Sequence, residues 1–89
     1  MSGNVFVNGG PVCDDEWELR DADVVCQMLF NVSALAATTD SLFGEVWEDF
    51  SMTRVNCTGQ EKKITDCQHE TEVYYCRDWE AAGVFCGGK

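Results

Sequence analysis

The sequence contains six cysteines in 89 residues, and this feature constrains the fold more than any other. A domain of this size buries a modest fraction of its surface, so it commonly needs a metal ion or disulfides for stability. Structural zinc sites use close pairs such as Cys-x-x-Cys, but no such pair occurs here and His69 is the only histidine. We therefore expect three disulfides and an oxidising, extracellular location. The spacing alone does not choose among the possible pairings.

The charge of the chain excludes one large class of partner. Sixteen acidic and six basic residues give a net charge of −10, whereas nucleic acids are bound through Lys and Arg against the phosphates. The apolar stretches are far shorter than a membrane-spanning helix, so we expect no membrane insertion of this segment. A hydrophobic content of 45% is too high for a disordered chain.

The length allows one domain over residues 1–89, with a core from about residue 3 to about residue 86 and linker residues at the ends. Residues 1–4 lack the basic start and apolar core of a signal peptide. We therefore expect the chain to be part of a longer secreted or membrane-anchored protein.

One helix is predicted from about residue 21 to about residue 30, because apolar residues recur there with a period near 3.6. The residues on that face are Ala22, Val25, Cys26, Leu29 and Phe30. Asp21 and Asp23 lie in the first turn, where carboxylates complement the helix dipole and cap free N–H groups. A short helical turn is expected at residues 34–37.

Several short runs have the composition of strands, with β-branched and aromatic residues between turn signals. They are residues 5–7, 46–52, 73–76 and 83–86. Strands around one helix predict an α+β fold.

The motifs resemble the scavenger receptor cysteine-rich (SRCR) domain. The likeness lies in residues 13–17 (CDDEW), 21–26 (DADVVC) and 82–86 (AGVFC), with 43–44 (FG) and 57–59 (CTG) between them. The resemblance implies a small disulfide-stapled domain in which a curved antiparallel sheet cradles one main helix. It also implies three disulfides, namely Cys13–Cys76, Cys26–Cys86 and Cys57–Cys67.

The cysteine count is similar to that of the six-cysteine, group A-like subgroup. Asn31 stands where members with eight cysteines carry an additional one, and no earlier cysteine is present to pair with it.

The resemblance also implies a metal site formed by Asp14, Asp15 and Glu80. Carboxylates provide the hard oxygen ligands that Ca²⁺ or Mg²⁺ prefers. The alternative is that these are three of sixteen acids on a solvated surface. A second cation position of the family is expected to be lost, because Thr53 and Arg54 replace an acidic pair there.

Trp47 and Trp79 are the candidate ligand contacts, because aromatic side chains often anchor interfaces. In a domain this small, these residues, with Tyr74 and Tyr75, are more commonly part of the core or of a half-buried sheet. Trp79 is the best candidate for exposure, since it precedes Glu80 in a loop.

Two N-glycosylation sequons begin at Asn31 and Asn56. Both suit an extracellular chain, although the pattern is also common by chance. Asn56 precedes a cysteine, which can hinder its modification.

We expect a non-catalytic extracellular module that recognises a protein or an anionic ligand with the help of a divalent cation. His69 has acids nearby, but nothing aligns it with a serine as a catalytic triad requires. The alternatives are a cation-independent protein–protein module and an accessory domain of a larger secreted enzyme or receptor. At a charge of −10, an anionic ligand is repelled at long range, and one cation adds only two charges. Ligand identity, parent protein and oligomeric state do not follow from the sequence.

Overall fold

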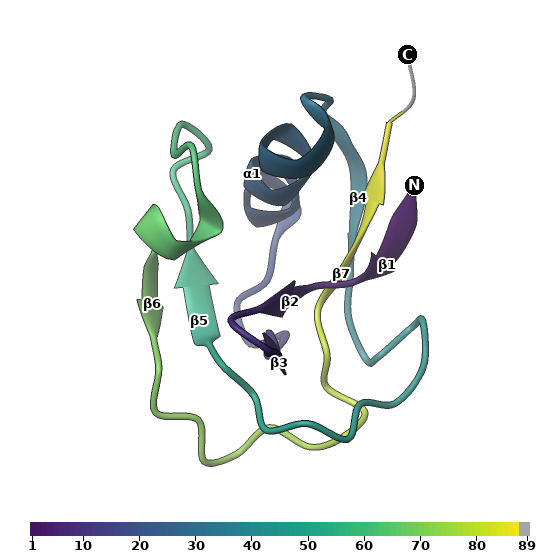
Figure 1. Ribbon diagram of the computed structural model, residues 1–89, viewed down its shortest axis with the longest axis vertical. Coiled ribbons are helices and arrows are strands. Elements are labelled where there is room, and N and C mark those ends of the chain that lie inside the picture. Colours follow the sequence, from purple (N-terminus) through teal and green to yellow (C-terminus); the bar gives the residue numbers. More distant parts are fainter. Residues whose placement is uncertain (88–89) are drawn as a thin grey trace.

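The fold is built around one helix, α1 (Leu19–Phe30), which packs against a three-stranded antiparallel sheet (Figure 1). The computed structural model describes residues 1–87. The sheet has the order β1 (Ser2–Asn4), β7 (Gly83–Cys86), β4 (Ala34–Thr38). Because the central strand comes last in the sequence, both chain ends contribute to one sheet, and the α+β prediction is confirmed.

Two small antiparallel ribbons complete the structure. One pairs β2 (Phe6–Val7) with β3 (Gly10–Pro11). The other pairs β5 (Thr53–Asn56) with β6 (Gln68–Glu70), and the 3₁₀ turn η1 (Ile64–Asp66) lies between these two strands. The single curved sheet implied by the resemblance is therefore divided into three short sheets among the described residues. Of the expected C-terminal linker, Gly88 and Lys89 lie outside the described residues.

The helix begins at Leu19, two residues before the predicted start, because Asp21 stabilises its first turn. The Asp21 carboxylate accepts a 2.7 Å hydrogen bond from the backbone N–H of Glu18, the N-cap residue. The helix ends at Phe30, and the left-handed backbone of its C-cap residue Asn31 (φ 56°) directs the chain towards β4.

Three of the predicted elements are wrong. Residues 34–37, expected as a helical turn, form most of β4, because pairing with the central strand β7 outweighs the local preference of alanine and leucine for helix. Residues 46–51 and 73–76 have strand-like composition but form no strand. Side chains with β propensity form strands only where a partner strand is present, and residues 46–51 and 73–76 pair with no strand among residues 1–87.

The core lies between α1 and the sheets. Its largest fully buried apolar side chains are Val12, Val24, Val25, Val55 and Ile64. Trp17 joins this core, and its indole N–H donates a 2.9 Å hydrogen bond to the carbonyl oxygen of Gly83 in β7. The predicted apolar face of the helix is buried at its start, whereas Leu29 and Phe30 at its end are 58% and 39% exposed.

Three disulfides connect the parts of the fold. They are Cys13–Cys76, Cys26–Cys86 and Cys57–Cys67, the pairings that the resemblance implies. Cys26–Cys86 joins α1 to β7, and Cys13–Cys76 joins the segment before the helix to the loop before β7. No cysteine of the chain is free.

Candidate functional site

The structure brings the three predicted metal ligands together. Carboxylate oxygens of Asp14, Asp15 and Glu80 all lie within 4.8 Å of one another. Backbone pairing creates this proximity, because Cys13 forms an antiparallel bridge with Ala81 and the N–H of Asp14 donates a 2.8 Å hydrogen bond to the carbonyl oxygen of Glu80. The Sγ atom of Cys13 is also near, but it is bonded to Cys76 and is no thiolate ligand.

Backbone N–H groups orient two of the three carboxylates. Asp14 accepts a 2.8 Å hydrogen bond from the N–H of Asp40, and Glu80 accepts one of 3.2 Å from the N–H of Arg77. Asp40 belongs to the turn after β4 and has a positive φ of 58°. Nothing in the sequence pattern marks Asp40, because its place beside Asp14 depends on how β4 pairs with β7.

The electrostatics of this carboxylate cluster favour a bound cation. Partial burial raises the pKa of Asp14 above its ordinary value of 3.8. The hydrogen bond from Asp40 opposes this, while the negative charges of Asp40, Glu80 and Asp15 raise the pKa further. Among residues 1–87 no Lys or Arg nitrogen lies within 4.0 Å of the three carboxylates. The donor set of close, hard and uncompensated oxygens therefore fits Ca²⁺ or Mg²⁺.

Arg54 lies in a separate small cavity of about 110 Å³. Asp15, Glu70 and Glu72 also line this cavity, and the Nε of Arg54 is 4.0 Å from a carboxylate oxygen of Glu70. Thr53 beside it is buried. The guanidinium therefore already provides a positive charge among these carboxylates.

The four candidate aromatic side chains lie outside the core, as expected for Trp79 but contrary to the core or half-buried placement that is more common for Trp47, Tyr74 and Tyr75. Trp47 is 81% exposed and Trp79 54%. Tyr74 and Tyr75 are exposed too, with their rings in an edge-to-face contact. The backbone N–H of Val46 donates a 3.0 Å hydrogen bond to the carbonyl oxygen of Asp78, which brings the loops carrying Trp47 and Trp79 side by side.

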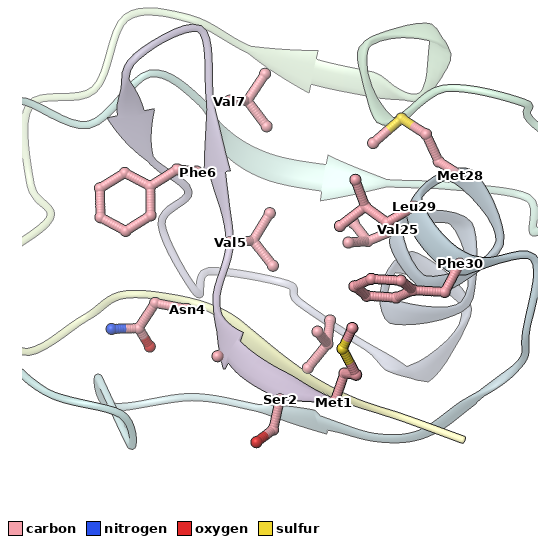
Figure 2. A pocket seen from close by; sticks show the side chains of 12 residues that line it. Met1, Ser2, Asn4, Val5, Phe6, Val7, Val25, Met28, Leu29 and Phe30 are labelled. Carbon is pink, nitrogen blue, oxygen red and sulfur yellow. The ribbon is translucent and has the colours of Figure 1, made fainter. Parts of the chain in front are cut away.

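An apolar groove of about 420 Å³ opens between the N-terminal segment and the end of α1 (Figure 2). Its lining includes Val5 and Phe6 on one side and Met28, Leu29 and Phe30 on the other, and it contains no charged side chain. This groove shares no residue with the carboxylate cluster. It explains the exposure of Leu29 and Phe30, which sequence periodicity places in the core.

The remaining predicted site residues are separated from the cluster. Asn31 caps the end of α1, and Asn56 is the last residue of β5; both are exposed. His69 lies in β6, and its Nδ1 is 2.6 Å from the carbonyl oxygen of Cys67, to which it donates a hydrogen bond.

Comparison with known proteins agrees with this architecture. The model of the scavenger receptor cysteine-rich domain family matches residues 2–87. A scavenger receptor cysteine-rich domain superfamily protein of Patiria pectinifera is 43% identical over 97% of this chain, and human lysyl oxidase homolog 2 is 43% identical over 92%. The chain spans only 8% and 11% of the lengths of these two relatives.

Two solved structures share the fold. The SRCR domain of mouse MARCO, described as a dimeric form, has a TM-score of 0.84 and 33% identity, over 98% of this chain and 87% of that one. The third SRCR domain of murine neurotrypsin has a TM-score of 0.82 and 41% identity, over 96% of this chain and 84% of that one.

The chain belongs to the scavenger receptor cysteine-rich domain family. Such domains are non-catalytic, extracellular ligand-binding modules that bind protein ligands, and they also occur as accessory domains, as in lysyl oxidase homolog 2. Within residues 1–87, no helix combines the length and apolarity needed to cross a bilayer.

Proposed function

We propose that this chain is a cation-assisted recognition module that binds a protein or an anionic ligand outside the cell. The observation that carries this proposal is the convergence of Asp14, Asp15 and Glu80 within 4.8 Å, with no Lys or Arg nitrogen of residues 1–87 within 4.0 Å of their carboxylates. A Ca²⁺ or Mg²⁺ ion held there would offset the repulsion among the carboxylates and offer an open coordination position to an oxygen of the ligand. The three disulfides and the asparagine at position 31 support membership of the six-cysteine subgroup.

The neighbouring aromatic side chains would contribute contact area. Trp79 precedes the proposed ligand Glu80, and the loop carrying Trp47 lies beside it. Large exposed aromatic rings bury much surface on binding at a low entropy cost. The same aromatic rings also favour the alternative of a cation-independent protein–protein module. The chain spans only a small share of the length of each relative, which favours the alternative of an accessory domain.

Calorimetric titration of CaCl₂ and of MgCl₂ tests the metal site directly. The wild-type chain should bind one ion, and Asp15→Ala and Glu80→Ala should each abolish or strongly weaken binding. Glu48→Ala is the matched control, because Glu48 is an exposed carboxylate outside the cluster. Unchanged binding in both cluster variants would rule out this assignment.

Ligand binding is then compared with and without EDTA on a heparin-coated surface, which serves as a polyanionic probe. Loss of binding in EDTA supports the bridging role of the cation. Binding that persists in EDTA but falls in Trp47→Ala or Trp79→Ala would favour the cation-independent module instead.

A further inference from the structure

The two N-glycosylation sequons occupy very different positions in the folded chain. Residues 31–33 follow α1, and residues 56–58 run from β5 into the loop closed by Cys57–Cys67. During secretion the amide nitrogen of a sequon asparagine attacks the anomeric carbon of an oligosaccharide carried on a lipid diphosphate. A C–N bond forms, the C–O bond to the diphosphate breaks, the lipid diphosphate leaves, and the amide nitrogen releases a proton. This transfer requires a free asparagine amide and an accessible hydroxyl two residues later.

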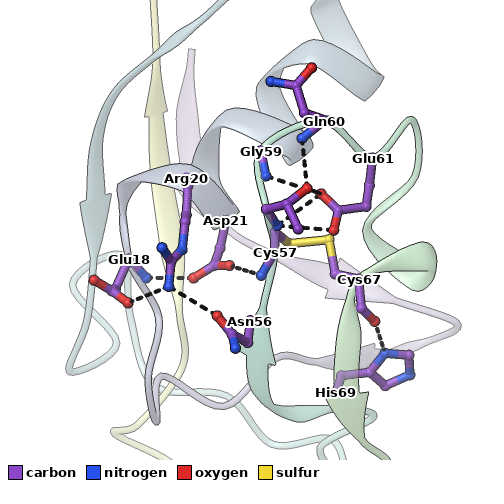
Figure 3. Close-up of a disulfide and its surroundings, with 11 residues drawn as sticks. Glu18, Arg20, Asp21, Asn56, Cys57, Gly59, Gln60, Glu61, Cys67 and His69 are labelled. Carbon is purple, nitrogen blue, oxygen red and sulfur yellow. Dashed lines mark hydrogen bonds and ion pairs between the residues drawn. A yellow bond between two sulfur atoms is a disulfide. The ribbon is translucent and has the colours of Figure 1, made fainter.

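In the second sequon Asn56 and Thr58 are exposed too, but the amide oxygen of Asn56 and the hydroxyl of Thr58 both make hydrogen bonds, and Figure 3 shows that of Asn56. The Oδ1 atom of Asn56 accepts a 3.0 Å hydrogen bond from the guanidinium of Arg20. The hydroxyl of Thr58 donates a 3.0 Å hydrogen bond to Glu61 and accepts one of 3.2 Å from the N–H of Gln60. Extracting either side chain for the transfer would break these contacts.

The middle residue of this sequon restricts the backbone as well. Cys57 is buried, its N–H donates a 2.7 Å hydrogen bond to Asp21, and its sulfur is bonded to Cys67, ten positions later. Closing a loop this short costs little chain entropy, so this disulfide can form early in folding. Once it has formed, the backbone of this sequon is held by the disulfide and is less free to adapt to a transferase.

The first sequon is open. Asn31 and Ser33 are both exposed, and neither side chain makes a hydrogen bond within residues 1–87. Only the backbone is engaged: the N–H of Asn31 bonds to Gln27, and the carbonyl oxygen of Ser33 accepts from Gly87. Asn31 has a left-handed backbone, and the chain turns there from α1 towards β4. Unlike the second sequon, residues 31–33 contain no disulfide-bonded cysteine.

We infer that Asn31 is the glycosylated residue of this chain and that Asn56 is left unmodified. The glycan extends from the turn between α1 and β4, at the end of the domain opposite the loops of residues 39–52 and 71–82 (Figure 1). It therefore leaves the carboxylate cluster and the two exposed tryptophans accessible. It also borders Phe30 and Met28, which line the apolar groove.

The test is secretion of the 89-residue chain from animal cells behind a cleavable signal peptide, followed by intact mass and glycopeptide analysis before and after peptide-N-glycosidase treatment. The expected result is one glycan per chain, located at Asn31. Ser33→Ala should abolish it while retaining the helix-capping asparagine. Thr58→Ala, the matched control in the second sequon, should leave the mass of the glycan unchanged. An unmodified Asn31, or a glycan at Asn56, overturns the inference.

A second experiment tests the reason for the selectivity. Replacing both Cys57 and Cys67 by serine opens the loop and frees the second sequon, so a second glycan should appear at Asn56. If Asn56 stays unmodified in this double variant, the disulfide and its contacts are not what protects it. Mass analysis of the secreted protein counts the glycans on this variant even if the variant is less stable.

Discussion

The carboxylate of Asp21 accepts a 2.7 Å hydrogen bond from the backbone N–H of Cys57, 36 residues further along the chain. Its other oxygen accepts from the N–H of Glu18 at the start of α1. One buried carboxylate thus stabilises the first turn of the helix and attaches that turn to the strand that enters the Cys57–Cys67 loop (Figure 3).

Asp21→Asn should therefore destabilise the domain. An asparagine retains one acceptor oxygen but presents an NH₂ group to the other N–H, so one hydrogen bond to a charged group is lost. We expect a decrease of about 1–3 kcal/mol in the free energy of unfolding, measured by urea denaturation. Asp66 is an exposed aspartate whose carboxylate accepts no hydrogen bond within residues 1–87, so Asp66→Asn should change the free energy of unfolding by less than about 0.5 kcal/mol.

The stability difference between wild type and Asp21→Asn should also depend on pH. Burial raises the pKa of Asp21 above 3.8, although hydrogen bonds from Cys57 and Glu18 oppose this. The folded state therefore binds a proton at a higher pH than the unfolded state does. As the pH falls through the folded pKa towards 3.8, the wild type gains stability relative to the variant, which cannot titrate there. Urea denaturation in steps from about pH 7 to about pH 4 measures the difference, and a difference that shrinks on acidification would contradict the raised pKa.

The sequence pattern predicts the parts of this structure that depend on local periodicity. The buried positions Ala22, Val25 and Cys26 define the helix, and the run that ends at Cys86 defines β7. Residues 34–37 and 73–76 were wrongly predicted for a physical reason. Whether such a segment becomes a strand depends on a partner strand that is distant in the sequence.

In the candidate site, too, some residues are predictable from sequence motifs and others only from tertiary packing. The family motifs single out Asp14, Asp15 and Glu80, but no pattern predicts Asp40, which reaches Asp14 only through the pairing of β4 with β7. Exposure of Trp47 and the contacts that engage Asn56 are likewise consequences of tertiary packing.

Gly83 in the central strand should tolerate no side chain. A Cβ atom there would lie 2.8 Å from the carbonyl oxygen of Gly3 and would also collide with the hydroxyl of Thr38. Both contacts belong to neighbouring strands of the same sheet, so the collision cannot be relieved without shifting backbone. Gly83→Ala should cost about 1–3 kcal/mol in the free energy of unfolding. Gly3→Ala is the control, since no atom lies within 4 Å of a Cβ at that position; an equal loss in both variants would refute the steric explanation.

The disulfides should contribute unequally to stability. In the chain-entropy model, Cys26–Cys86, which spans 60 positions, stabilises by about 4 kcal/mol. Cys57–Cys67, which spans 10, stabilises by about 3 kcal/mol. We replace both cysteines of each pair by alanine and measure thermal unfolding. Replacing Cys26 and Cys86 should lower the stability more, because it also leaves a cavity between α1 and β7. A larger loss for the short loop would show that contacts such as Asp21 with Cys57 outweigh the loop entropy.

Asp14→Asn should have opposite effects on stability with and without a cation. Partial burial and the nearby charges of Asp40, Glu80 and Asp15 raise the pKa of Asp14, so its ionised form is unfavourable in the metal-free domain at neutral pH. An asparagine removes that charge and still accepts the hydrogen bond from the N–H of Asp40 through its Oδ1. In EDTA the variant should therefore unfold at the same temperature as the wild type or at a higher one.

Added CaCl₂ reverses this order. An ion that binds only the folded state raises the midpoint of thermal unfolding with its concentration, by an amount set by its affinity. The wild type should gain stability on titration with CaCl₂, while Asp14→Asn, which lacks one anionic ligand, should gain little. Differential scanning fluorimetry measures the unfolding temperature in EDTA and over a series of calcium concentrations. Glu48→Ala is the control and should respond to calcium as the wild type does. Destabilisation of Asp14→Asn in EDTA would mean that the Asp14 charge is compensated by the fold itself, and the case for a cation at this cluster would fail with it.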